Sequence, residues 1–360
     1  MKTQLSQFNV VVLGAGPAGL VAALECSKNH PTTLIACQLP STEDAPRVEA
    51  VPASLLALFV EFGIHPQQIG VEGLHESRRI AWEQEAIVES RGPVAAHVER
   101  PLLDLALLKV VLACGRVKIV LNDHREACKA MLEAARCHDD LRVIDATGRR
   151  SVSARKKIQP TRPWAAQTFL TLRQSCRAGP ELRIAALPGG FVYRLGSSKH
   201  LVLGIVGRNK TIVGDPLKLE QQLFECGAGW ILEELPEMAD LIPGRFSAAS
   251  VQWTSDGVGL RVGDAALARD TLSSQGLAAG ISDALYCAAA VRSDDDGTLV
   301  SLRHVEQRAA HLRSLEQLIA RCRFREEGIW REYAEFVAGQ VDPTPAESRV
   351  ALRAGRLALG

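Results

Sequence analysis

The chain has 360 residues, too many for one small core, so one large domain or two fused domains are expected. Hydrophobic residues make up 47%, charged residues 23%, and the net charge is +1, which is ordinary for a soluble globular protein and gives no reason to expect nucleic acid as a partner. No stretch approaches the ~18 apolar residues that cross a bilayer, and no apolar signal region precedes the first predicted strand, so we expect no membrane insertion and a cytoplasmic location.

The first part of the chain alternates short apolar strands with helices. Strands are predicted at 8–13 and 32–37, and the helix between them, at 17–29, is apolar on most sides. Such βα units are typical of a parallel sheet buried on both faces. Beyond them we expect a loop at 38–52, which holds three prolines, helices at 53–64, 97–115 and 122–140, and a buried strand at 141–148.

The middle third has a different pattern, in which short apolar runs alternate with turns, as in "RIAALPGGFVYRLG" and "KHLVLGIVG". This pattern predicts an antiparallel sheet. The elements expected after it are helices between 216 and 240, a strand-and-turn unit at 257–268, a helix at 276–292, and an arginine-rich helical region at 300–338 before a polar tail. One side of that last region carries Leu312, Leu315, Leu318, Ile319 and Cys322, which predicts packing on the body of the protein.

The nine cysteines and nine histidines follow no ligand pattern. The cysteines are scattered without a CxxC pair, and the histidines lack HExxH spacing. An odd, unpatterned set of cysteines suits reduced thiols better than a disulfide framework, and no metal site is predicted.

A glycine-rich loop joins the first strand to the first helix. Residues Gly14, Ala15, Gly16, Pro17, Ala18 and Gly19 satisfy the pattern GxGxxG directly after an apolar strand. In that setting the first glycine permits a tight turn, the second lets the backbone approach a pyrophosphate, and the third lets helix and strand pack closely. The exposed N–H groups and the helix dipole then favour a diphosphate, so the loop predicts a dinucleotide site.

The acidic residue that usually contacts a ribose in such a unit is absent. Its position falls near Cys37 and Gln38. We expect Gln38 to accept the ribose hydrogen bond without the assistance of a charge, which predicts weaker binding than usual. Glu43 and Asp44, just beyond, are the alternative contacts.

A later segment, "VGDAALARDTLSSQGLAAGISDALYCAAAV", completes the pattern. Together with the glycine loop it resembles the FAD-dependent aromatic hydroxylases and flavin-dependent tryptophan halogenases. The resemblance implies that the loop binds the diphosphate of FAD, that Gly263 and Asp264 bind the ribityl and phosphate groups, and that Gly276 and Leu277 lie beside the flavin ring. Thr271 stands where the family usually has a proline.

Three more segments carry the resemblance: "RVEAVPASLLALFVEFGI" at 47–64, "HVERPLLDLALL" at 97–108 and "VIDATGRRS" at 143–151. They imply that Arg47 and Arg100 help to hold the cofactor. Glu49 is a candidate catalytic acid/base or flavin-facing group, with a salt bridge at the helix entry as the alternative. Within the superfamily, the first two segments most resemble the flavin monooxygenases that hydroxylate a tryptophan during tryptophylquinone biogenesis in a quinohemoprotein amine dehydrogenase. The segment between 115 and 141 is short and helix-like, where relatives have room for an extra strand pair.

The implied fold is α/β: a Rossmann-like FAD-binding domain of the glutathione-reductase type, an antiparallel substrate domain and C-terminal helices. The expected FAD-binding domain is discontinuous and comprises 1–70, 97–160 and 255–298. The expected substrate domain comprises 71–96 and 161–254, and the C-terminal helical region comprises 299–360.

The implied activity is that of a monooxygenase, in which reduced FAD reacts with O₂ to give a C4a-hydroperoxide beside an aromatic substrate. A halogenase of this type would need a lysine near 71–85, where the sequence has Arg78 and Arg79, and a WxWxIP motif that the region around Trp164 lacks. Hydroxylation is therefore favoured. His75, Trp82 and the two arginines are minor candidates, with packing or surface roles as the alternatives.

The substrate is expected to be an aromatic small molecule or a residue of a protein or peptide. NAD(P)H is expected as an external reductant, because no second glycine-rich motif supplies a domain for it. Two other functions stay open: a flavin reductase or dehydrogenase resembling the geranylgeranyl reductases, and a non-catalytic binding module of the same fold. Nothing in the sequence predicts an oligomeric state.

Overall fold

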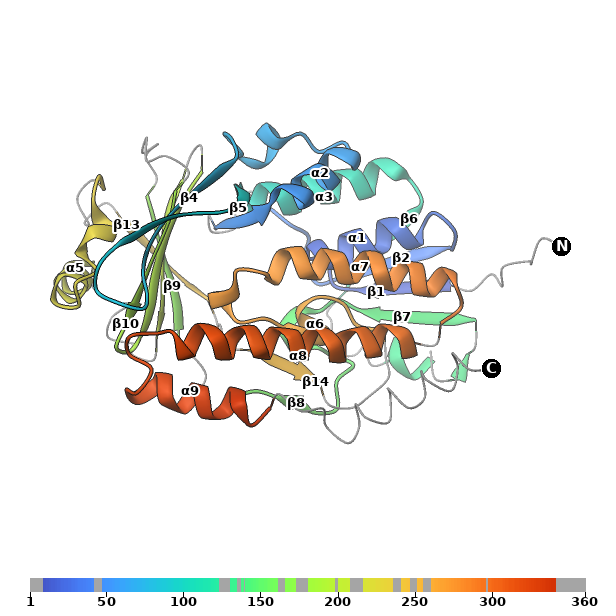
Figure 1. The fold of residues 1–360 in the computed structure, drawn as a ribbon. Coiled ribbons are helices and arrows are strands. Elements are labelled where there is room, and N and C mark those ends of the chain that lie inside the picture. Colours follow the sequence, from blue (N-terminus) through green and yellow to red (C-terminus); the bar gives the residue numbers. More distant parts are fainter. Residues whose placement is uncertain are drawn as a thin grey trace.

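The fold comes from a computed structural model. It describes residues 9–41, 47–122, 130–134, 137–138, 140–160, 166–172, 181–197, 200–207, 216–235, 241–246, 251–254, 260–295 and 297–340. These residues form a four-stranded parallel sheet, an eight-stranded mixed sheet and a two-stranded ribbon, with helices around them (Figure 1).

The parallel sheet has the strand order β6-β2-β1-β7. The βα unit predicted at its centre is confirmed, as is the strand near 141, and both strands of the unit are apolar because helices cover the sheet. The strand β6 corrects the expectation of a helix-like segment between 115 and 141, because it pairs in parallel with β2. The bounds are β1 Asn9–Leu13, α1 Pro17–Cys26, β2 Thr32–Ala36, β6 Val117–Leu121 and β7 Leu141–Asp145.

The helices α1 and α7 lie side by side on this sheet, and α3 packs against α1 (Figure 1). Small residues allow the close approach at the start of both helices, where the Cβ of Ala18 lies only 3.7 Å from where a Cβ on Gly280 would stand. The helix predicted at 276–292 is confirmed at both ends. The helices and turns of this layer are α2 Ala53–Glu61, η1 Pro66–Ile69, α3 Arg100–Cys114, η2 Gly148–Arg150, α6 Asp264–Leu267, η6 Thr271–Ser273 and α7 Gly276–Arg292.

The mixed sheet has the order β13-β9-β12-β11-β10-β4-β5-β3. It is antiparallel, as predicted, except for one parallel pair between β4 and β10. The expectation of a loop throughout 38–52 is wrong at its end, because Val48–Pro52 pairs with β5 as the edge strand β3, where a terminal proline is tolerated. The other bounds are β4 His75–Ala81, β5 Val88–Glu99, β9 Ala166–Leu172, β10 Leu182–Leu187, β11 Gly190–Gly196, β12 Leu201–Gly207 and β13 Leu241–Phe246. β5 extends to Glu99, so the helix predicted at 97–115 begins only at Arg100, as α3.

The C-terminal helices pack on the body, as predicted. Leu312, Leu315 and Ile319 are buried in one core with aromatic residues of the mixed sheet. The indole N–H of Trp330 donates to the carbonyl of Leu187, and that of Trp82 donates to the carbonyl of Leu318, both at 2.8 Å. Trp82 is therefore a packing residue. The helices are α8 Thr298–Ala320 and α9 Gly328–Ala338, and the ribbon beneath them is β8 Lys157–Ile158 with β14 Gln252–Thr254.

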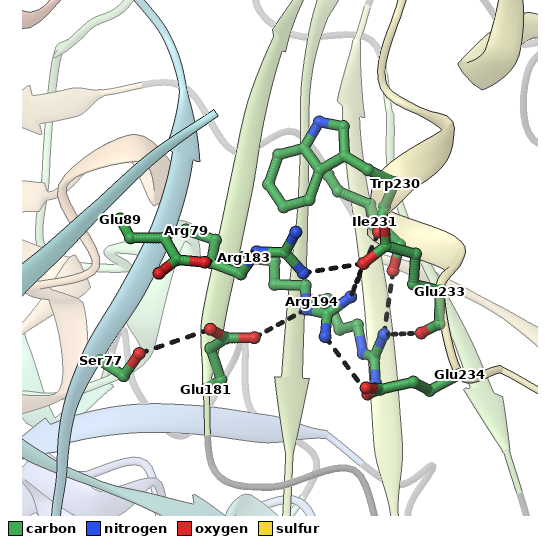
Figure 2. A network of polar contacts seen from close by, with 10 residues as sticks. All are labelled: Ser77, Arg79, Glu89, Glu181, Arg183, Arg194, Trp230, Ile231, Glu233 and Glu234. Atoms are coloured by element: carbon green, nitrogen blue, oxygen red, sulfur yellow. Dashed lines mark hydrogen bonds and ion pairs between the residues drawn. The ribbon is translucent and has the colours of Figure 1, made fainter. Parts of the chain in front are cut away.

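A network of arginines holds a short segment against the outer face of the mixed sheet (Figure 2). Buried Arg183 and Arg194 donate to backbone carbonyls of the turn η4, Gly229–Leu232, which follows α5, Pro216–Glu225. Arg79 reaches the same turn and pairs with Glu233 at 2.8 Å. This arginine, a minor candidate for binding a substrate carboxylate, is thus engaged within the protein.

The face of the mixed sheet opposite this network points toward the parallel sheet. Residues alternate between the two faces along each strand, so Leu182 and Ile184 lie on the inner face while Arg183 lies on the outer one. The inner face is therefore available to line a cavity. Within the described part of the chain, no helix has both the length and the apolar character to span a membrane.

We predict that stability falls as the pH is lowered from 7 to 5. Burial lowers the pKa of His97 to about 3, with the nearby His75 adding to the effect, and burial beside Arg269 lowers that of His311 to about 4. Both stay neutral in the folded protein, whereas the unfolded chain takes up protons below about pH 6.5. Stability is thus fully present above that pH and is lost toward the folded pKa, by about 1.4 kcal/mol per histidine and pH unit.

Urea unfolding at pH 7, 6 and 5 measures this loss. His97→Asn is the control, since asparagine keeps an N–H donor for the carbonyl of Gly196, 2.7 Å from the ring nitrogen, but has no titrating proton. A wild-type free energy of unfolding that is equal at pH 7 and pH 5 would contradict the prediction.

Candidate functional site

A cavity of about 440 Å³ lies between the two sheets. Its walls come from the glycine loop, from β3 and the start of α3, from the loop between α6 and α7, and from the inner faces of β10 and β11. The parallel sheet presents the carboxyl ends of its strands here, which is where α/β sheets bind ligands. The segments that carry the sequence motifs therefore converge on one cavity.

The three glycines of the loop have different surroundings. Gly14 has φ +106°, and a Cβ there would lie 2.5 Å from the carbonyl oxygen of Ala146. A Cβ on Gly19 would lie 1.9 Å from the carbonyl oxygen of Gly14, so both positions are closed to a side chain by the protein itself. Around Gly16, by contrast, no described atom apart from its own neighbours along the chain lies within 4 Å of the Cβ position. Gly16 borders the cavity and leaves room for a ligand against the backbone.

The start of α1 faces this open part of the cavity. Gly16 precedes the helix, Pro17 is its first residue, and no side chain caps it. A helix start without a side-chain cap offers its N–H groups and its dipole to an anion. A diphosphate group fits this end of the cavity.

Ion pairs order the charged residues at the cavity wall. Arg100 donates to Glu49 at 2.8 Å and to Asp104 at 2.6 Å, and Arg47 lies 3.0 Å from Glu49. The backbone N–H of Arg100 also donates to the carbonyl of Arg47 at 2.8 Å. Burial alone would raise the pKa of Glu49, but the charges of Arg100 and Arg47 outweigh it and lower the pKa. Glu49 is therefore an anion that holds two arginines in place, which favours the salt-bridge alternative left open by the sequence.

The second motif lies directly against the first. Gly263 has φ +58°, and a Cβ there would stand 3.2 Å from the Cβ of Ala18. Asp264 follows it with its carboxylate open to the cavity and 3.8 Å from the guanidinium of Arg149. Burial raises the pKa of Asp264, and the charge of Arg149 offsets only part of that rise. A carboxylate in this setting accepts hydrogen bonds from hydroxyl groups of a ligand.

The structure brings together most of the predicted site residues. Gly16, Pro17, Ala18, Arg47, Glu49, Arg100, Gly263, Asp264, Gly276 and Leu277 all line the cavity. Gly14, Ala15 and Gly19 form the turn behind it.

Some predicted residues lie elsewhere. Gln38 follows β2 as an exposed residue outside the cavity lining, so its contact with a ribose stays a prediction. His75 packs against His97 with ring centroids 4.1 Å apart. Glu43, Asp44 and Trp164 lie outside the described residues. Among the residues that the structure describes, no group of three or more potential ligands could hold a metal ion.

Comparisons with known proteins give a fold but no sequence family. No protein-family model matches the chain, and no curated protein matches its sequence. Solved structures do match. The peptidyl tryptophan dihydroxylase QhpG, essential for tryptophylquinone cofactor biogenesis, has a TM-score of 0.67 at 17% identity, over 91% of this chain and 78% of that one.

Two further structures extend the likeness. The flavin-dependent halogenase CmlS has a TM-score of 0.67 at 16% identity, over 97% of this chain and 73% of that one. A geranylgeranyl bacteriochlorophyll reductase-like protein from Thermoplasma acidophilum has a TM-score of 0.58 at 16% identity, over 96% and 95% of the two chains. This chain has the fold of the flavin-dependent halogenases and hydroxylases. The expected α/β fold class and the resemblance read from the motifs are confirmed at that level.

The sequence did not predict which residues form the wall opposite the glycine loop. In this flavoenzyme fold it is formed by Leu182, Ile184, Phe191, Tyr193 and Leu195 on β10 and β11. The period-2 alternation in "RIAALPGGFVYRLG" was the available signal, but only the sheet pairing decides which face turns inward. Arg149 and Arg269, which also line the cavity, carried no signal beyond their place near the motifs.

We predict that the glycines of the loop respond differently to alanine. Gly16→Ala should leave the free energy of unfolding within ~0.5 kcal/mol of wild type, because its φ of −74° and its open surroundings accept a methyl group. The methyl group should nevertheless raise the Kd for FAD at least about tenfold, because it occupies the space that a diphosphate needs. Fluorescence titration with FAD and urea unfolding measure the two effects.

Gly19→Ala is the matched control in the same loop. Its Cβ meets a backbone oxygen, so the variant should lose about 2 kcal/mol or more of stability. Equal FAD affinity in wild type and Gly16→Ala would contradict the assignment of the open space to a ligand.

Proposed function

We propose that the protein is an FAD-dependent monooxygenase that hydroxylates an aromatic substrate, with the tryptophan side chain of a peptide as a leading candidate. One observation carries the proposal: a single cavity joins a diphosphate-type glycine loop to an aromatic and apolar sheet face. A cofactor held at one end and a substrate on the other would meet inside it.

The residues at the loop end suit FAD. The open backbone at Gly16 would accept the diphosphate, the paired Arg47 and Arg100 would hold the cofactor, and Asp264 would accept hydrogen bonds from its hydroxyl groups. When bound, FAD supplies the chemistry that activates O₂. The protein contributes binding, orientation and the exclusion of water.

The residues at the sheet end suit an aromatic ring. Phe191 and Tyr193 lie with ring centroids 6.3 Å apart and planes tilted by 31°, and Leu182 and Ile184 continue this apolar surface. Aromatic rings favour such offset neighbours, and an apolar wall removes water from a reacting ring. The similarity to the peptidyl tryptophan dihydroxylase supports the same class of substrate.

Hydroxylation is preferred to halogenation on the chemistry of the available side chains. The described lining of the cavity includes Arg47, Arg100, Arg149 and Arg269 but no lysine. A guanidinium stays protonated at physiological pH, so it does not provide the neutral amine that a halogenating lysine would. In hydroxylation, one aromatic C–H becomes C–OH, the second oxygen atom of O₂ leaves as water, and NAD(P)H supplies the two electrons through FAD.

A second candidate is a flavin-dependent reductase. The similarity to the geranylgeranyl reductase-like protein, which this chain covers over 95% of its length, supports it, as does the apolar sheet face. Such an enzyme would transfer a hydride to an alkene and would have no need for O₂.

The deciding experiment reconstitutes the purified protein with FAD, removes free cofactor by gel filtration, and reduces the bound flavin without oxygen. The reduced protein is then mixed with isotopically labelled O₂ and with indole, phenols or a tryptophan-containing peptide. We expect a product that carries one labelled oxygen atom. Flavin reoxidised by an alkene without O₂ would favour the reductase, and a protein that retains no FAD would remove both candidates.

We also predict that Gly204 sets the position of Tyr193. The two residues are paired across β11 and β12, and a Cβ on Gly204 would lie 2.1 Å from Cζ of the tyrosine ring. Gly204→Ala should therefore push the ring aside and change the affinity for an aromatic probe such as indole about tenfold, with little change in FAD affinity.

The double variant Gly204→Ala, Tyr193→Ala tests the cause. Once the ring is gone, the alanine at 204 should have no further effect on indole binding, so the two changes should be strongly non-additive. Additive effects would mean that Gly204 acts through another part of the sheet.

A further inference from the structure

The loop between α6 and α7 forms one wall of the cavity, at Asp270, Thr271, Leu272 and Ser274. It belongs to neither large sheet. Ser274 has φ +50°, a conformation that non-glycine residues adopt only when their surroundings impose it. The contacts that hold this loop therefore decide the shape of the cavity where the helix α7 begins.

Asp270 organises the loop from within. Its side chain is buried, with 1% of the residue exposed. One carboxylate oxygen accepts the backbone N–H of Leu272 at 2.9 Å, and the backbone carbonyl accepts both the N–H and the hydroxyl of Ser273, at 3.1 and 2.8 Å. Asp270 is thus the N-cap of the turn η6, and the carboxylate fixes the turn only if it is itself held in place.

The C-terminal helices hold it. The second carboxylate oxygen of Asp270 accepts the hydroxyl of Tyr333 in α9 at 2.6 Å, a short bond to a charged acceptor. The backbone N–H of Asp270 donates to Nε2 of His311 in α8 at 3.2 Å. Both partners are buried, with 5% and 3% of each residue exposed. The helices α8 and α9, which are far from the glycine loop in sequence, thus contact Asp270, the residue that shapes this wall of the cavity.

We propose that Tyr333 and His311 are positioning residues for the cofactor: they anchor Asp270 and so keep the loop 270–275 in the form that receives FAD. The proposal rests on the proposed function, because it takes FAD as the ligand. The C-terminal helices would then be part of the cofactor site without touching the cofactor.

Tyr333→Phe tests the proposal because it removes one hydroxyl and keeps the ring. The Kd for FAD should rise about tenfold or more, since the bond to a carboxylate is lost, and the visible circular dichroism of the bound flavin should change. Tyr286→Phe is the matched control. Tyr286 lies late in α7, outside the cavity lining, and its ring contacts Arg303, so this variant should keep the wild-type Kd within about twofold.

The outcomes are distinct. If Tyr333→Phe lowers the melting temperature but binds FAD with the wild-type Kd and spectrum, the tyrosine is structural only and the proposal is overturned. If the wild-type protein itself retains no FAD, the proposed function fails, and hydrogen exchange in the free protein decides the anchor. Faster exchange at the amides of Leu272 and Ser273 in Tyr333→Phe, but not in Tyr286→Phe, would support the anchor, and unchanged exchange would overturn it.

Discussion

The structure depends on the close approach of backbone to backbone where β1, α1, β7 and α6 meet. At Gly14 and Gly19 the protein fills the space of a side chain with its own carbonyl oxygens. At Gly263 the turn before α6 comes within van der Waals distance of α1 and α7. This packing brings two motifs that are about 250 residues apart in sequence to the same end of one cavity.

Several charged residues at the cavity wall are paired with residues of opposite charge. Glu49 neutralises part of the charge of Arg47 and Arg100, and Asp264 faces Arg149. Removing a charge from water is costly unless a partner replaces the solvent, and here the acidic partners are Glu49 on β3 and Asp264 at the start of α6. The pair of Glu49 on β3 with Arg100 at the start of α3 therefore joins the mixed sheet to the helical layer as well as ordering the site.

The parts of the fold that the sequence predicted are those with local signals. The unit β1-α1-β2 and the helix α7 have continuous apolar patterns bounded by glycine, and their packing obeys those patterns. β3 and β6 could not be predicted because they are short, half-exposed edge strands whose conformation comes from pairing with distant partners. The aromatic wall and the role of Asp270 could not be predicted from the sequence for the same reason. Tertiary contacts decide which face of β11 turns inward and which side chains reach Asp270. Thr271, where the resemblance implies a proline, is the first residue of the turn η6, whose N-cap is the buried carboxylate of Asp270.

The arginine network on the outer face of the mixed sheet has a consequence for how the inner face can vary. On β10 and β11 the residues that donate hydrogen bonds to the turn η4 alternate with the residues that line the cavity. Along each of these strands, the residues that hold η4 and the residues that line the cavity thus occupy alternate positions. Substitution of Leu182, Ile184 or Phe191 would change the cavity wall and leave the hydrogen bonds of Arg183 and Arg194 to the turn η4 in place. One face of these strands therefore holds the neighbouring segment, and the other face shapes the cavity. Divergence among proteins of this fold is expected to concentrate on the alternate residues of the cavity face.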